Sequence, residues 1–146
     1  MIREDIVSAF FALLQTIPGV NTFSRRLKHW DDVQPDAQPA LYLTCDKQTV
    51  IQDTSGLTPV WKIQLTIYLY VFNADVTSTP SIALNNFLDV IEGMLVPTVG
   101  PLGFPNTVQT LGGLVRYAWI SGPIETDEGV LGDQAIAIIP IEIEYV

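Results

Sequence analysis

The sequence predicts one α+β domain, residues 1–146, with a largely antiparallel β-sheet, two helices packed on one face of it and a long β-hairpin. Three observations lead to this fold class. Two stretches repeat apolar residues at helical spacing, several others alternate apolar and polar residues, and the order along the chain is helix, strands, helix, strands. A chain of 146 residues is long enough to bury the core of one domain without disulfides.

Both helices are predicted from an apolar stripe with identifiable ends. In residues 2–17 the apolar side chains recur every three or four positions, and Pro18-Gly19 ends the helix. The second helix begins at Thr79-Pro80, a capping residue followed by a proline suited to the first turn, and stops at Pro97. The spacing therefore predicts two amphipathic helices that pack on a common core.

Between the helices, residues 41–46 and 60–72 alternate with period two and predict two strands joined through a turn at 53–56. The lone Cys45 falls on an apolar face, which predicts a buried thiol. The second strand would extend about 43 Å at about 3.3 Å per residue, which is long for a strand. Its second face ends in the aromatic residues Tyr68, Tyr70 and Phe72. We therefore expect a hairpin that reaches beyond its own domain, with residues 47–59 and these aromatics contacting a neighbour.

After the second helix, residues 97–113 predict a long connection, and strands follow at 114–121 and 135–145. Residues 127–133 read as a loop between those two strands. Pro140 lies inside the last strand and cannot donate a backbone hydrogen bond there. It therefore predicts an edge position or a bulge.

Residues 20–40 contain a short basic stretch that leads to a tryptophan and is followed by prolines. Two interpretations stay open for this segment: a solvated loop with its tryptophan against the core, or a docking loop, since Arg and Trp are common at binding hot spots. The candidate interaction residues here are Arg25, Arg26, Lys28 and Trp30.

Charge is scarce and unevenly placed. Only 16% of the residues are charged, while the mean hydropathy is +0.31. Either water or other protein must cover the resulting apolar surface, and the second option favours assembly with copies of the chain or with partners. The net charge is −9, and residues 63–146 carry Arg116 alone against nine acids. Such a surface repels phosphate backbones and argues against specific nucleic-acid binding.

No apolar run approaches the length needed to span a bilayer, so the sequence predicts no membrane contact. The acids Glu4 and Asp5 do not suit a signal peptide. We therefore expect a protein made in a cytoplasm.

Catalytic motifs are missing from the sequence. His29 is the only histidine and Cys45 the only cysteine, and the two fall in different contexts. The acids Glu125, Asp127 and Glu128 lie close together but do not match an EF-hand loop, and a solvated loop, an interaction surface and a metal site all remain open for them. We expect a protein that is not an enzyme and that has no catalytic residue, cofactor site or metal site.

Several strings along nearly the whole chain carry a resemblance to a known family. After a helix ending in Ile-Pro-Gly come "SRRLKHWDDV", "QPALYL", "PVWKIQLTIYLYV", "LNNFLDVIEGML", "QTLGGLV" and "IETDEGVLGDQAIAIIPIEIEY". The chain resembles small proteins of phage and prophage tail modules, and these are similar to the phage tail terminator family.

The resemblance implies a structural virion protein at the head-proximal end of the tail, assembled in the host cytoplasm. It implies a homo-oligomeric ring, hexameric in that family, that caps the tail-tube protein and joins it to the head-tail connector. DNA would pass through the ring without being specifically bound. The alternatives are another head-tail junction or tail-tube ring subunit, or a small α+β adaptor or ligand-binding module.

In such a ring the acids acquire a possible role. We hypothesise that some of them face the central channel and repel passing DNA, while the basic stretch faces protein. The alternative is that they only keep an apolar protein soluble. The residues concerned are Glu125, Asp127, Glu128, Asp133, Glu142 and Glu144.

Overall fold

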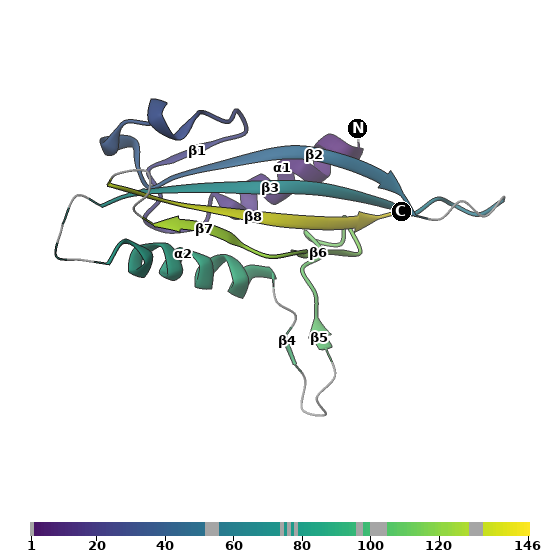
Figure 1. Cartoon of the computed structure of the whole chain (residues 1–146). Helices are drawn as coiled ribbons and strands as arrows, with labels where there is room; N and C mark the ends of the chain where they lie inside the picture. The colour runs from purple at the N-terminus through teal and green to yellow at the C-terminus, as the bar shows by residue number, and fades with distance from the viewer. Residues whose placement is uncertain are drawn as a thin grey trace.

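The computed structural model describes residues 2–51, 56–73, 75, 77, 79–95, 98–99, 105–128 and 133–146. Two α-helices and eight strands lie in these ranges (Figure 1). The helices are α1 (Ile2–Leu14) and α2 (Pro80–Leu95), and two short 3₁₀ turns span Trp30–Asp32 and Pro35–Ala37. The strands are β1 (Thr22–Ser24), β2 (Ala40–Val50), β3 (Trp61–Phe72), β4 (Thr98–Val99), β5 (Pro105–Thr107), β6 (Tyr117–Ile120), β7 (Glu125–Glu128) and β8 (Gln134–Tyr145).

Six of the strands form one sheet in the order β1-β2-β3-β8-β6, with β7 also pairing β8. All pairs are antiparallel except β1 with β2. The three long strands β2, β3 and β8 run side by side across the molecule, and β2 and β3 form the long hairpin (Figure 1). The predicted fold class is confirmed.

The main core lies between the helices and one face of the sheet. In β3 the predicted alternation holds: Ile63, Leu65, Ile67 and Leu69 are each at most 1% exposed. They pack in one cluster with residues of both α1 and α2, so the two helices cover the same sheet face. No described α-helix packs against the other face, which we call the open face.

One end of the open face is covered by the loop between β1 and β2. Trp30, Val33 and Ala37 of that loop pack against a smaller cluster on the strands. Tyr42 and Tyr70 lie in this cluster with ring centroids 5.5 Å apart, and both are buried. Trp30 is half-buried, as expected of a tryptophan set against the core.

Pro140 occupies a position where β8 is locally an edge. β7 pairs with β8 up to Ile138, and β6 pairs with it from Ile141 onward. Between these two ladders the chain turns away from β8 at Gly122-Pro123. On this side of β8 the backbone N–H of Ser121 donates to the Pro140 carbonyl at 3.0 Å. The missing N–H of Pro140 is therefore tolerated inside a central strand, which confirms the prediction of a local edge.

Several predictions need correction. β1, too short to show a period, lies in the predicted irregular segment, and the acids at 125–128 form β7 rather than a loop. β4 and β5 lie in the predicted long connection and pair with each other. All twelve residues of β3 pair with β8, so the strand itself does not extend beyond the sheet. Cys45 is exposed, because the buried part of β2 ends at Leu43 and the strand is exposed from Cys45 to Val50.

Some predicted features lie outside the described residues: most of the turn at 53–56, the helix stop at Pro97, and residues 129–132. Among the described residues, no helix combines the length and apolar character that crossing a membrane requires.

We expect the main core to dominate stability. Ile67→Ala should lower the free energy of unfolding by about 2–5 kcal/mol, because it leaves a cavity where the side chain is fully buried. Ile82→Ala removes the same atoms from α2, where the side chain is 61% exposed, and should change stability by less than about 0.5 kcal/mol. Urea denaturation of both variants measures this, and equal losses would contradict the assigned core.

Candidate interaction surface

The open face offers partly apolar side chains to a partner. Register with β3 and β8 places Tyr68, Ile138 and Pro140 on this face, and all three are half-buried. Trp119 of β6 lies opposite Glu142 on the same face and is 38% exposed. Sequence reasoning missed Trp119, Ile138 and Pro140 because their side is defined only once β8 is known to pair with both β3 and β6.

A depression lies on this face beside β7. It measures about 270 Å³ and is lined by Thr66, Pro123, Glu125, Ile138 and Pro140. A second hollow of about 230 Å³ continues along β7 and shares Glu125 and Ile138 with the first. The floor is thus apolar, with an exposed carboxylate on one wall.

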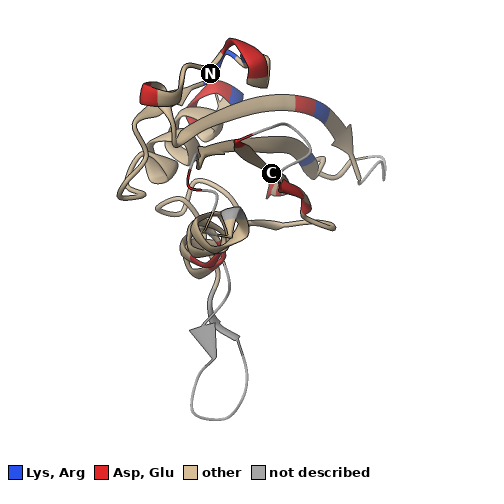
Figure 2. Ribbon diagram, turned by 60° about the vertical axis from the view of Figure 1, so that its left-hand side comes forward, with Lys and Arg blue, Asp and Glu red and all other residues tan. Residues whose placement is uncertain are grey.

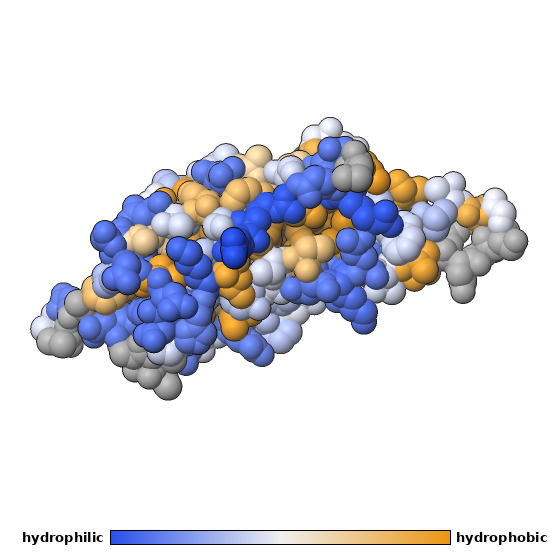
Figure 3. Space-filling model, turned by 90° about the horizontal axis from the view of Figure 1, so that it is seen from above, coloured by the Kyte–Doolittle hydropathy of each residue, from blue (hydrophilic) through white to orange (hydrophobic). Residues whose placement is uncertain are grey.

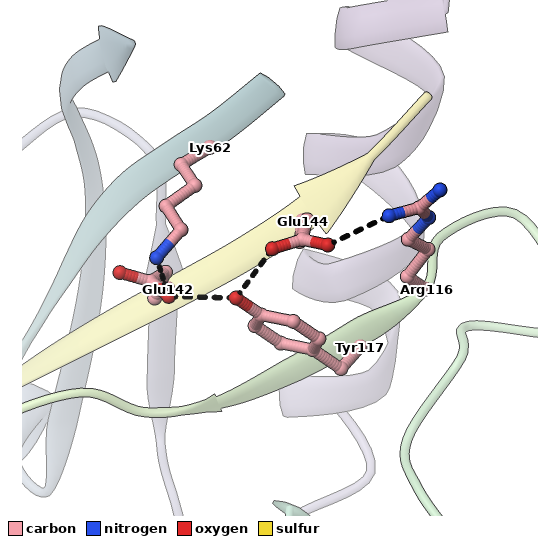
Figure 4. Close-up of polar contacts among 5 residues, drawn as sticks. All are labelled: Lys62, Arg116, Tyr117, Glu142 and Glu144. Atoms are coloured by element: carbon pink, nitrogen blue, oxygen red, sulfur yellow. Dashed lines mark hydrogen bonds and ion pairs between the residues drawn. The ribbon is translucent and has the colours of Figure 1, made fainter. Parts of the chain in front are cut away.

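Farther along the open face, five polar side chains form a charge-balanced cluster (Figure 4). Lys62 Nζ lies 3.0 Å from Glu142, and Arg116 Nη1 lies 3.1 Å from Glu144. The Tyr117 hydroxyl is 2.8 Å from both carboxylates, which share its single proton. Both glutamate side chains are only 14% exposed, so two adjacent like charges on one strand are held by compensation within the chain.

Tyr117 is fixed on its other side by stacking. Its ring lies 3.8 Å from that of Trp119, centroid to centroid, with 23° between the planes. Burial, and then the hydrogen bonds and charges of Glu142 and Glu144, raise the pKa of the Tyr117 phenol far above its usual value. The phenol therefore stays protonated and donates to the carboxylates.

The basic stretch after β1 divides into a paired and an unpaired part. Arg25 forms an ion pair with Glu4 of α1. Arg26 and Lys28 are exposed and form no ion pair within the described residues. Along the ribbon, acidic segments are more frequent than basic ones (Figure 2). Asp31, Asp32 and Asp36 follow in the same loop, so the positive charge is confined to the start of it.

The predicted aromatic contact residues do not share one environment. Tyr70 is 4% exposed, its hydroxyl donates to the Lys28 carbonyl at 2.9 Å, and burial raises its pKa to about 12. The loop of the same chain therefore takes Tyr70 out of the surface that a neighbour can contact. Tyr68 and Phe72 are half-buried on the open face and remain candidates.

The six acids predicted to face a channel also separate. Glu142 and Glu144 lie in the compensated cluster, so they contribute little uncompensated charge. Glu125, Glu128 and Asp133 are exposed, and Asp127 is half-buried on β7. The hypothesis of a repelling surface therefore depends on the carboxylates around β7.

A further exposed apolar group lies at the end of the β2–β3 hairpin. Val50, Ile51 and Leu57 are 42%, 46% and 59% exposed. Seen from above, the molecule shows apolar residues among the hydrophilic surface, including toward this end (Figure 3). The exposure of these residues could not be predicted from the period-two pattern. The alternation of side chains is the same along a strand whether or not a helix covers its end.

Within the described residues, no group of three or more His, Cys, Asp or Glu side chains is arranged to hold a metal ion. His29 Nδ1 accepts a hydrogen bond from the backbone N–H of Asp31 at 3.2 Å and caps the first 3₁₀ turn. The histidine therefore has a local structural role in its loop.

Comparison with known proteins bears on the fold alone. No protein-family model matches the chain, and no curated protein matches it. One similar solved chain, whose description gives no function, is 12% identical, with a TM-score of 0.50 over 99% of this chain and 94% of that one. Another comes from the virion of a native gene transfer agent particle and is 11% identical, with a TM-score of 0.42 over 98% of this chain and 90% of that one. The first likeness concerns the fold alone.

The Glu4–Arg25 pair predicts a pH-dependent contribution to stability. Hydrogen bonds from Arg25 and then Ser8 lower the pKa of Glu4 from 4.5 to about 2. A carboxylate whose folded-state pKa is lowered stabilises the fold above its unfolded pKa and loses that effect as the pH falls. Glu4→Gln should therefore lower the free energy of unfolding at neutral pH by a small amount, because the pair is exposed.

The difference between Glu4→Gln and the wild type should shrink between pH 4.5 and about 2. Denaturant unfolding over this pH series measures it. Arg25→Gln removes the same pair and should show the same convergence, whereas a difference that is constant with pH would contradict the assignment.

The polar cluster predicts a specific cost for losing one hydroxyl. Tyr117→Phe keeps the ring on Trp119 but removes the donor shared by two half-buried carboxylates, and should cost about 1–3 kcal/mol in the free energy of unfolding. Tyr68→Phe is the matched control, since the Tyr68 hydroxyl makes no hydrogen bond to a described residue. Thermal or urea unfolding compares the two, and equal effects would contradict a structural role for the cluster.

Proposed function

We propose that this chain is a non-catalytic structural subunit of a phage-like particle, one that forms a ring at the head-proximal end of the tail tube. The observation that carries the proposal is the one-sided sheet. Both helices lie on one face, while the open face presents half-buried apolar side chains that the chain's own loop covers only at one end. Surfaces of this kind are typical of protein–protein contacts.

Two further features support assembly over catalysis. The low charge content leaves apolar residues exposed on the open face and at the hairpin end. The sequence strings similar to the tail terminator family extend over nearly the whole chain. The alternatives are another ring subunit of the head-tail junction or tail tube, and a small α+β adaptor or ligand-binding module.

In the proposed ring the carboxylates around β7 either face the channel and discourage DNA from binding, or only maintain solubility. Glu125 and Glu128 carry the exposed charge available for the first role. The partners of the ring would be the tail-tube protein below it and the head-tail connector above it.

The copy number in the particle tests the proposal. We expect a closed ring of six copies in a reconstruction of the particle, and the purified chain should reach a defined multiple of 16.1 kDa as its concentration rises. Native mass spectrometry and light scattering measure that mass. A single copy in the particle, outside any symmetric ring, would end the proposal.

A further inference from the structure

We propose that one copy of the chain docks its Arg26-Leu27-Lys28 segment into the open-face depression beside Glu125 of a second copy. The inference rests on the proposed ring and names the contact that would build it. It follows from two features of the chain that form no ion pair with each other within it.

The docking segment has a fixed backbone and unused side chains. The Arg26 N–H donates to Ser24 Oγ at 3.0 Å, and the Ser24 hydroxyl donates to the Arg26 carbonyl at 3.3 Å. The Lys28 carbonyl accepts the Tyr70 hydroxyl at 2.9 Å. Between these anchors Leu27 is 40% exposed, flanked by two cations without an ion pair among the described residues. A segment ordered in advance loses little entropy on binding.

The depression offers the complementary chemistry. Ile138 and Pro140 provide an apolar floor for a leucine side chain, and Glu125 provides a carboxylate at the wall. Glu125 forms no ion pair with a described residue. Arg25 does not belong to the contact, because Glu4 already neutralises it. Leu27 between two cations thus matches the apolar floor beside the Glu125 carboxylate. Such complementarity favours one orientation of the segment in the depression.

We assign the occupant to a second copy, because neither Arg26 nor Lys28 forms an ion pair with Glu125 within one chain. The Lys28 carbonyl lies against Tyr70 of β3, whereas Glu125 belongs to β7, on the other side of β8. A contact between two different surfaces of identical chains is heterologous, and it closes into a ring when the rotation between copies permits.

Charge reversal in the full-length chain tests the contact. Lys28→Glu and Glu125→Lys should each weaken self-association on the order of tenfold, and the chain that carries both should recover it, because every interface then contains the inverted pair. Leu27→Ser tests the apolar part and should also weaken association. Sedimentation or light scattering over a concentration series measures each constant, and circular dichroism verifies that each variant is folded.

Two matched controls remove the effect of net charge. The double change Asn85→Asp and Asn86→Asp lowers the net charge by two, as Lys28→Glu does, and Glu92→Lys raises it by two, as Glu125→Lys does. These positions are exposed on α2, outside the contact, and the variants should associate as wild type does. If the two reversals leave association unchanged, or if their combination does not restore it, the inference is overturned. A wild-type chain that stays monomeric at every concentration also overturns it, whereas the proposed function is decided separately by the copy number in the particle.

Discussion

The continuous pairing of β3 with β8 is the constraint on which the rest of the structure depends. Twelve residues of each strand are in register, which fixes the inward and outward side of every residue along both. One side is apolar throughout, and α1 and α2 suffice to cover it. The other side carries Tyr68, Ile138 and Pro140 in its middle and charged residues at one end. A sheet of this length with a single helical layer therefore leaves a chemically mixed face for the remaining loops and for partners.

Charge is used sparingly on that face, and its placement separates structural from available groups. Glu142 and Glu144 would repel each other on one strand, but Lys62, Arg116 and the Tyr117 hydroxyl compensate them. Two of the chain's seven Lys and Arg side chains and one tyrosine hydroxyl thus bind carboxylates at one end of β8. Among the described residues, Glu125 and Glu128 of β7 form no ion pair, and neither do Arg26 and Lys28. These charges are therefore the ones available for the proposed contact between copies.

The sequence was sufficient to predict the elements with strong periods. Both helices, the β3 alternation and the local edge at Pro140 follow from apolar spacing and from the backbone chemistry of proline. β1 could not be predicted, because three residues do not define a period. The burial of Tyr70 and the exposure of Cys45 were equally inaccessible, since they depend on which loop or strand covers the end of a face. For the same reason the interaction residues predicted from the sequence included Tyr70 and lacked Trp119. The sheet face on which Trp119 lies is set by the pairing of β6 with β8.

The sheet edges explain why side chains, rather than backbone pairing, should join copies. Beyond Tyr42 no described strand pairs with the outer edge of β2, but that edge carries a bulge between Cys45 and Lys47 and the charged residues Asp46 and Lys47. At the other edge β6 and β7 are four residues each, and three of the four in β7 are acidic. Bulges, charges and short strands are the devices by which proteins prevent strand addition. With both edges blocked in this way, the proposed self-assembly would use the open face and the loops that border it, which include Arg26 and Lys28 after β1.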